Sequence, residues 1–299
     1  MKWAIALVAL ITVVTLGAAI AFVSPPKLLS IADGLAGGGS GAKRAGSAIA
    51  FGSKGQTLDV WVPEQSGETP RPVLVFFHGG GWVKGDRDAY AFAGRAFASR
   101  GFVVVIPDYR KVPDVRFPAF IEDGADAVAW TYENVGRFGG DPERIALAGH
   151  SAGAHTAVTL ALDPRWLRGR ALDPEVVKAA IGLSGPYDFY PFDKKRSIDA
   201  MSQWPEPRDT QPIEFARADA PPLLLVTSSE DTVVRPYNAV NLAAKLREVG
   251  APVEFENYEG LSHEDVMMAI SKIYRGKAPV LDRGVTFLEN AMETGNVAR

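Results

Sequence analysis

The stretch Ile145–Leu162, which reads IALAGHSAGAHTAVTLAL, decides the fold of this chain. A short apolar run is followed by GHSAG at 149–153 and then by a helix-like apolar segment. This order of strand, sharp turn and helix is typical of the G-x-S-x-G nucleophile elbow, in which glycines flank a serine on a strained turn. We therefore predict that the Ser151 hydroxyl is a nucleophile exposed above a sheet. The backbone N–H of Ala152 is then expected to face the attacked carbonyl.

A glycine loop upstream has the composition of an oxyanion hole. HGGGW at 78–82 directly follows Val73–Phe77, a second apolar run that indicates a buried strand. Glycines at such positions let backbone N–H groups approach a tetrahedral oxyanion without an intervening Cβ. We predict that the N–H groups of Gly80 and Gly81 act together with that of Ala152. A flexible turn is the alternative, whereas the motifs of phosphate-binding loops are absent.

The base that would activate the serine is found by elimination. The chain contains four histidines, and in folds that carry such a serine elbow the order along the chain is serine, acid, histidine. Only His263 follows the serine by more than a few residues, so it is the predicted base. His78 is expected to steady the glycine loop by hydrogen bonding, whereas His150 and His155 belong to the turn and its helix.

The acid is expected after a strand end that precedes the histidine. Pro222–Thr227 is an apolar run expected to form a strand, and SSED follows it at 228–231. We predict that Asp231 is the acid, with Glu230 as the alternative, because Asp231 lies at the turn into a helix that begins near Pro236. A simple helix-entry residue is the other interpretation of Asp231.

Taken together, these motifs resemble those of the α/β-hydrolases. The resemblance is greatest to a bacterial esterase/lipase group related to hormone-sensitive-lipase-like enzymes, feruloyl and acetyl-xylan esterases, and kynurenine formamidases. It covers about residues 45–290 and is carried by HGGGW at 78–82, PDYR at 107–110, FGGDP at 138–142, GHSAG at 149–153, SGPYD at 184–188, Asp231 and His263. One departure is Ser262, because many triad histidines of this group follow a glycine.

The alternation of elements predicts a single α/β domain with a mostly parallel sheet covered by helices on both faces. Strands are expected at 47–51, 57–62, 73–77, 102–106, 145–148, 179–183, 222–227 and 252–258, and helices near 88–99, 119–137, 152–162, 236–249 and 264–274. The triad candidates and the glycine loop all follow strand ends, which is where ligands bind in such sheets.

The stretch 189–215 interrupts this alternation and is rich in aromatic residues and proline. We predict that Tyr190 and Trp204, together with Trp82 beside the glycine loop, shape an acyl or aryl pocket. Ordinary packing is the alternative for each of them. The stretch is too short for a large lid domain, so an accessible site and small substrates are expected.

Composition excludes several classes of function. The chain has no cysteine, so thiol nucleophiles, disulfides and cysteine-bound zinc are ruled out. The histidines form no H-E-x-x-H motif, which argues against a metal hydrolase. Acyl transfer through a serine needs no cofactor, so none is expected. The formal net charge is −3 and no basic stripe is present, which argues against a nucleic-acid partner. The expected partner is a small-molecule ester, and the oligomeric state is left open.

The N-terminal segment predicts export. Trp3–Val23 carries no charge and is long enough to span a bilayer, and Ala19-Ile20-Ala21 resembles a signal-peptide cleavage site. We expect a hydrophobic signal or membrane anchor over 1–24, a flexible glycine-rich tether over 25–46 and the catalytic domain over 47–299. The positions of Lys2 and Lys27 favour a cytoplasmic N-terminus, with a periplasmic or membrane-anchored catalytic domain outside the cytoplasm.

The resulting functional hypothesis is a serine hydrolase that cleaves short-acyl carboxylic esters through an acyl-enzyme. An amide or formamide hydrolase of the kynurenine formamidase kind, or a peptidase, would share every motif above. A non-catalytic binding protein on the same scaffold is the third alternative. Such proteins have usually lost a triad residue, and here none is missing.

Overall fold

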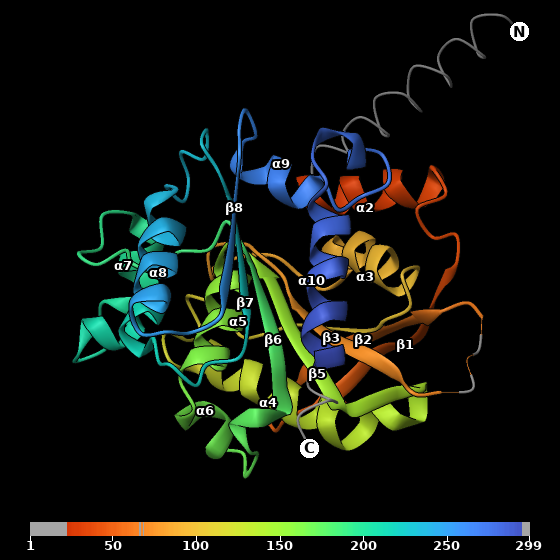
Figure 1. Ribbon diagram of the computed structural model, residues 1–299, viewed down its shortest axis with the longest axis horizontal. Coiled ribbons are helices and arrows are strands. Elements are labelled where there is room, and N and C mark those ends of the chain that lie inside the picture. Colours follow the sequence, from red (N-terminus) through yellow and green to blue (C-terminus); the bar gives the residue numbers. More distant parts are fainter. Residues whose placement is uncertain (1–22, 66, 68, 295–299) are drawn as a thin grey trace, which may run out of the picture.

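The computed structural model describes residues 23–65, 67 and 69–294, and a sheet of eight strands lies at the centre of this described part (Figure 1). The strands are β1 Ala42–Phe51, β2 Gln56–Pro63, β3 Arg71–Phe77, β4 Val103–Pro107, β5 Gly140–His150, β6 Val177–Leu183, β7 Leu223–Ser228 and β8 Val253–Tyr258. Their spatial order is β1-β2-β4-β3-β5-β6-β7-β8. β2 runs antiparallel to both of its neighbours, and all pairs from β4 to β8 are parallel.

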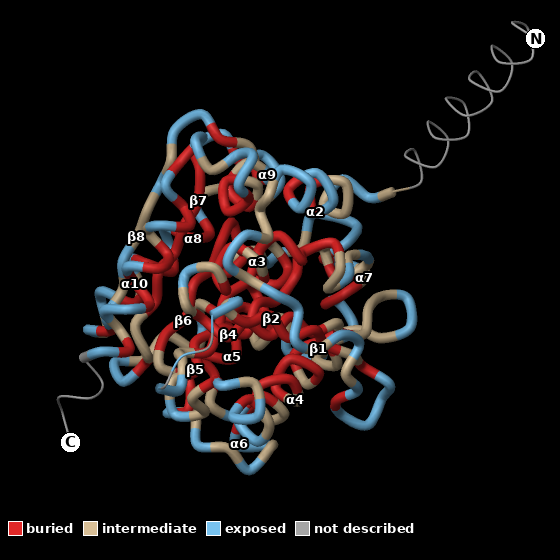
Figure 2. Tube along the Cα trace, turned by 90° about the vertical axis from the view of Figure 1, so that its right-hand side faces the viewer, coloured by how far each residue is buried: buried red, intermediate tan, exposed pale blue. Residues whose placement is uncertain are grey.

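Helices cover both faces of the sheet, as predicted (Figure 1). The helices are α2 Pro25–Leu35, α3 Ala91–Ala98, α4 Ala119–Asn134, α5 Ala152–Leu162, α6 Arg165–Arg168, α7 Lys195–Met201, α8 Tyr237–Glu248, α9 His263–Met268 and α10 Val280–Thr294. Successive side chains of a strand point to opposite faces. In β3, Val73 and Val75 belong to the buried cluster that includes residues of α4, α5 and α8, whereas Leu74 and Phe76 belong to the cluster that includes residues of α3, α9 and α10. Figure 2 shows the buried residues concentrated along the strands and the helix sides that face them.

The predicted strands and helices are present, although the short helices α6 and α7 were not predicted and two further differences lie near the C-terminus. The helix expected at 264–274 ends at Met268. After it, the N–H of Lys272 donates to Asp33 Oδ1 at 2.7 Å, which ties this turn to α2. Helix α10 is missing from the prediction, although its buried residues Leu281, Val285, Leu288 and Met292 recur at helical spacing.

Residues 25–46 do not form the flexible tether that their composition predicts, and this prediction is wrong. They form α2, a glycine turn and the start of β1. Asp33 of α2 is buried and forms an ion pair with Arg95 of α3 at 2.8 Å. A Cβ on Gly38 would collide with the Asp33 carboxylate. The glycines therefore let the backbone turn closely past the buried carboxylate of Asp33. The folded domain begins well before residue 47.

The predicted signal or membrane anchor covers residues 1–24. Its residues 1–22 lie outside the part of the chain that the structure describes. Among residues 23–65, 67 and 69–294, no helix has the length and apolarity needed to cross a membrane.

Candidate active site

Ser151 occupies the sharp turn between β5 and α5, with φ 56° and ψ −121°. A residue with a side chain adopts this backbone conformation only under strain. A Cβ on Gly149 would collide with the backbone of Gly153, and a Cβ on Gly153 would collide with the Phe77 carbonyl. The N–H of Ser151 donates to the Leu183 carbonyl at 2.9 Å, which ties the turn to the next strand. The two glycines are thus needed for the reason that the sequence motif implies.

His263 and Asp231 form a buried pair. His263 Nδ1 lies 2.8 Å from Asp231 Oδ2, and the two residues are 5% and 2% exposed. The other carboxylate oxygen of Asp231 accepts the N–H groups of Val233 and Val234 at 3.0 and 2.8 Å. Because a carboxylate can only accept, His263 Nδ1 carries the proton, and Nε2 of the neutral ring is unprotonated. Glu230 is exposed, and within the described residues its carboxylate accepts a hydrogen bond from Ser229 alone, so the structure pairs Asp231, not the alternative, with the histidine.

Ser262 has a structural task that explains the absence of the expected glycine. It is the N-cap of α9, and its Oγ accepts the N–H of Asp265 at 3.1 Å. Asp265 Oδ2 in turn accepts the N–H of Ser262 at 3.0 Å, which completes a capping box. This arrangement makes His263 the first residue of α9 and fixes its backbone.

His150 contacts the same histidine from the serine side. Its Nε2 lies 3.1 Å from the His263 carbonyl, and its Nδ1 lies 3.0 Å from the Tyr90 hydroxyl. Burial lowers the pKa of His150 well below its usual range, so the ring is neutral. Since a carbonyl only accepts, Nε2 donates to His263 and Nδ1 accepts from Tyr90. Nothing in the sequence marked Tyr90 as part of this chain of hydrogen bonds.

Ser151 and His263 do not share a hydrogen bond in the described structure. The ring of His150, the residue before Ser151, nevertheless lies 4.7 Å from the His263 ring. Catalytic hydrogen bonds are often loose without substrate and tighten in the reacting complex. The geometry therefore presents the serine and the Asp231–His263 pair at one edge of the sheet, at the carboxyl ends of β5, β7 and β8.

The glycine loop after β3 requires glycine at its centre. Gly80 has φ 137°, and a Cβ there would collide with the Lys84 carbonyl. His78 Nδ1 donates to the Gly79 carbonyl at 2.9 Å, in the steadying position expected of it. Gly81 and Ala152 line the same cavity as Ser151, whereas Gly80 does not.

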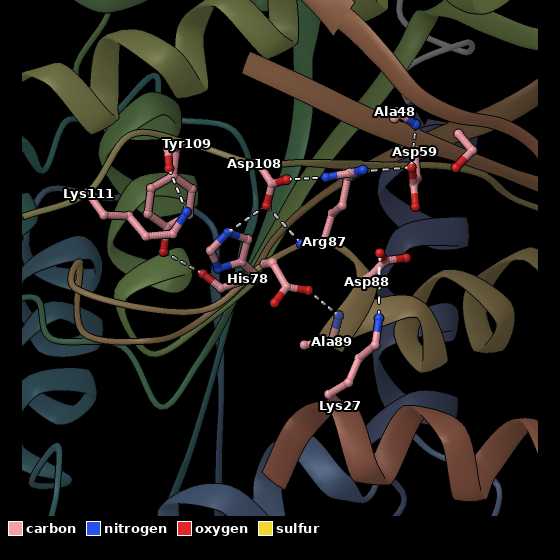
Figure 3. Close-up of polar contacts among 12 residues, drawn as sticks. Lys27, Ala48, Asp59, His78, Arg87, Asp88, Ala89, Asp108, Tyr109 and Lys111 are labelled. Carbon is pink, nitrogen blue, oxygen red and sulfur yellow. Dashed lines mark hydrogen bonds and ion pairs between the residues drawn. The ribbon is translucent and has the colours of Figure 1, made fainter. Parts of the chain in front are cut away.

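A network of hydrogen bonds and ion pairs stabilises this loop on the side away from the cavity (Figure 3). The Tyr109 hydroxyl donates to the His78 carbonyl at 2.8 Å, and Asp108 Oδ1 lies 3.5 Å from His78 Nε2. Arg87 joins Asp108 to the buried Asp59 of β2. Burial raises the pKa of Asp108, but the adjacent His78 ring and the hydrogen bonds and charge of Arg87 outweigh it and leave that pKa below its usual range. The PDYR motif at 107–110 therefore supports the glycine loop from β4.

The cavity beside Ser151 has a volume of about 470 Å³. Of the three aromatic residues predicted to shape it, Trp82 lines the cavity, together with Phe189. Trp204 packs edge-on against Phe117 in the core, and Tyr190 is 43% exposed. The structure therefore does not bring Tyr190 and Trp204 to the cavity. For Trp204 the reason is packing, since a large aromatic ring gains more from burial against neighbours such as Phe117 than at an open cleft.

A glycine loop after β3, a strained serine after β5 and a buried acid–histidine pair after β7 and β8 define an α/β-hydrolase. The comparisons with known proteins lead to the same class. The chain belongs to the BD-FAE family, whose model matches residues 58–246.

Two curated relatives have esterase names. Esterase LipC of Mycobacterium tuberculosis is 35% identical over 228 residues, which cover 70% of this chain and 56% of that protein. The probable isoprenylcysteine alpha-carbonyl methylesterase ICME of Oryza sativa subsp. japonica is 31% identical over 234 residues, with coverage of 71% and 56%. The chain thus spans little more than half the length of these relatives.

Solved structures share the fold. A truncated carbohydrate esterase from gut microbiota superposes with a TM-score of 0.70 at 19% identity, covering 85% of this chain and 97% of that one. The butyrate-bound Est2 of Thermogutta terrifontis gives 0.69 at 22% identity, covering 84% and 94%. The predicted α/β-hydrolase fold and the resemblance to the esterase/lipase group are confirmed.

Proposed function

We propose that this chain is a serine carboxylesterase-type hydrolase that cleaves carboxylic esters through an acyl-enzyme. The observation that carries the proposal is the buried Asp231–His263 pair, 2.8 Å apart, beside a serine held in a strained turn. The esterase names of the curated relatives support the same activity.

The reaction proceeds in two acyl-transfer steps. Ser151 Oγ attacks the ester carbonyl carbon while His263 Nε2 takes its proton, and Asp231 stabilises the resulting imidazolium. Collapse of the tetrahedral intermediate breaks the bond to the alkoxy oxygen, which receives the proton from His263. A water molecule then attacks the acyl-enzyme with the same proton transfers in reverse order and releases the acid.

The negative charge of each tetrahedral intermediate requires fixed N–H donors. We assign this task to the backbone N–H groups of Gly81 and Ala152, which line the cavity with Ser151, and keep the N–H of Gly80, the residue that precedes Gly81 in the loop, as the third predicted donor. In acyl-transfer enzymes, the loss of one such donor lowers kcat by about 10²–10³.

We further propose that the enzyme prefers esters with short acyl chains. The cavity of about 470 Å³ is bounded by Trp82 and Phe189, and the covering helix α7 has only seven residues. A panel of 4-nitrophenyl esters from acetate to decanoate tests this preference. Higher kcat/KM for the long-chain esters than for acetate or butyrate would refute it. N-formylkynurenine and a peptide amide in the same panel separate ester from formamide and amide hydrolysis.

The nucleophile is tested by Ser151→Ala in the full chain. Turnover and labelling by a fluorophosphonate are both expected to disappear, because the hydroxyl forms the acyl-enzyme. Ser184→Ala is the matched control: Ser184 also has a positive φ, of 48°, but its Oγ is buried and does not reach the cavity. Labelling that persists in Ser151→Ala and disappears in Ser184→Ala would overturn the assignment.

For the location, we propose an exported enzyme, either released after cleavage or anchored by its N-terminal segment. The support is the uncharged run Trp3–Val23. Fractionation of full-length protein with a C-terminal tag tests it. Activity in the cytoplasmic fraction with Met1 retained would refute both versions.

A further inference from the structure

The cavity beside Ser151 is lined by more positive than negative charge. Its cationic lining residues are Lys194, Lys195, Arg196 and Arg235, and Asp193 is the acidic lining residue among those that the structure describes. The chain as a whole has a formal net charge of −3. The positive charge is therefore a local property of this cavity and does not follow from the composition of the protein.

The two lysines have carboxylate neighbours. Lys194 Nζ lies 3.9 Å from Asp193 Oδ2, and Lys195 Nζ lies 2.7 Å from Asp199 Oδ2. Both pairs are largely exposed and contribute little to stability. They nevertheless offset part of the positive charge at the cavity mouth.

The two arginines have no such neighbours. Within the described part of the chain, the guanidinium groups of Arg196 and Arg235 make no ion pair and no hydrogen bond with the protein. Arg87, Arg95 and Arg110, in contrast, are each paired with a buried carboxylate. A guanidinium presents five N–H donors in a planar fork. At this cavity two such forks are available to a ligand.

The two arginines reach the cavity from different elements. Arg196 belongs to α7, and its side chain runs along the glycine loop: a Cβ on Gly81 would lie 2.7 Å from Arg196 Cδ and 3.2 Å from Nη1. Arg235 lies in the turn between Asp231 and α8. Since Gly81 and Ser151 line the same cavity, a small ester bound at Ser151 lies within reach of both walls.

We propose, on the basis of the esterase activity proposed above, that the substrates are esters that carry a second, negatively charged group. Arg196 and Arg235 bind that group, a carboxylate being the simplest one that matches the guanidinium fork. The positive lining also raises the local concentration of an anionic ester and hence its association rate. The charged group is on the acyl part or on the alcohol part of the ester, and the experiment below distinguishes these two arrangements.

Two pairs of esters provide the test in the full-length protein. 4-Acetoxybenzoate and 4-acetoxybenzamide differ by a negative charge on the alcohol part, and phenyl hemiglutarate and phenyl pentanoate differ by one on the acyl part. The measured quantity is the ratio of kcat/KM for the anionic ester to that for its neutral partner, compared between enzyme variants so that intrinsic reactivity cancels.

In one of the pairs, Arg196→Gln and Arg235→Gln are expected to lower this ratio by roughly twofold to fivefold each, as suits contacts with exposed guanidinium groups. Hydrolysis of the neutral ester is expected to change little. Arg196→Lys, which keeps the charge, restores part of the loss. High salt lowers the ratio of the unmodified enzyme. Arg247→Gln is the matched control, because Arg247 is exposed at the far end of α8 and lies outside the cavity lining.

Ratios that stay unchanged in both arginine variants, for both pairs, would overturn the inference while the hydrolysis of neutral esters upholds the proposed function. If no ester is hydrolysed, the proposed function fails, and binding to the unmodified protein decides the inference separately. Calorimetric binding of 4-acetoxybenzoate or phenyl hemiglutarate that is lost in Arg196→Gln and Arg235→Gln would support it. The inference would be overturned if the unmodified protein bound neither ester, or if the affinity stayed the same in both arginine variants.

Discussion

Asp231→Asn is a sharp test of the site because the structure dictates how the new amide must lie. Asp231 Oδ1 accepts two backbone N–H groups, from Val233 and Val234. In the asparagine variant only the amide oxygen can keep these two hydrogen bonds. The NH₂ group must then take the place of Oδ2 and face His263 Nδ1, which lies 2.8 Å away in the unmodified protein. As a donor, it requires His263 Nδ1 to be unprotonated, so the proton moves to Nε2.

The magnitude follows from this forced tautomer. A histidine with its proton on Nε2 cannot take the proton of Ser151, and in serine hydrolases this exchange lowers kcat by about 10⁴. That factor corresponds to about 5 kcal/mol of transition-state stabilisation. Turning the amide over would leave both backbone N–H groups facing an NH₂ group, at a cost of about 1–3 kcal/mol for each buried donor. The asparagine variant can therefore regain the active histidine tautomer only at a substantial cost in free energy.

The assay is steady-state hydrolysis of 4-nitrophenyl acetate, with circular dichroism to verify folding. The loss is expected in kcat with KM little changed, because the cavity lining is untouched. Glu230→Gln, one residue away and exposed, is the matched control and should keep nearly full activity. A loss of less than tenfold in Asp231→Asn, or a larger loss in Glu230→Gln, would refute the assignment of the acid.

Three further predictions concern the loop and the buried histidines. Gly80→Ala is expected to lower kcat by at least about 10², because the added Cβ collides with the Lys84 carbonyl and displaces an oxyanion donor; unchanged ester hydrolysis would contradict this. His150→Ala removes the hydrogen bond to the His263 carbonyl, so kcat should fall about 10- to 100-fold at similar KM, as in the loss of supporting partners elsewhere; a change in KM alone would argue against this positioning role. Burial lowers the pKa of His155 to about 4 from its ordinary 6.5, so the unfolded chain takes up a proton first and stability falls by about 3 kcal/mol as the pH drops from 6.5 to 4. Urea unfolding over this pH range should show a flatter dependence for His155→Gln, which keeps a donor for the Thr210 carbonyl, and an equal slope in both proteins would contradict the reasoning.

The glycine-rich run at 37–41 shows where composition misleads. Glycines suggest a flexible linker when they are considered alone. Here, Gly38 is required because the buried Asp33 lies directly beneath it, and Asp33 is buried because Arg95 pairs with it from α3. That ion pair joins residues 62 positions apart, so no local sequence pattern could have predicted it.

The sequence alone predicted the sheet, and it was enough to propose Ser151 as the nucleophile and His263 as the base. Buried parallel strands appear as continuous apolar runs, and the collisions that force glycine at 149 and 153 are local to the elbow, so both leave a direct trace in the order of residues. Elimination sufficed for His263 because the chain has so few histidines. Only the tertiary structure placed the predicted acid Asp231 against His263 and formed the hydrogen bonds of Tyr90 and His150. It also brought Arg196 and Arg235 to one cavity. These features depend on the direction in which side chains of distant elements point, and that direction is set by packing across the fold, not by neighbours along the chain.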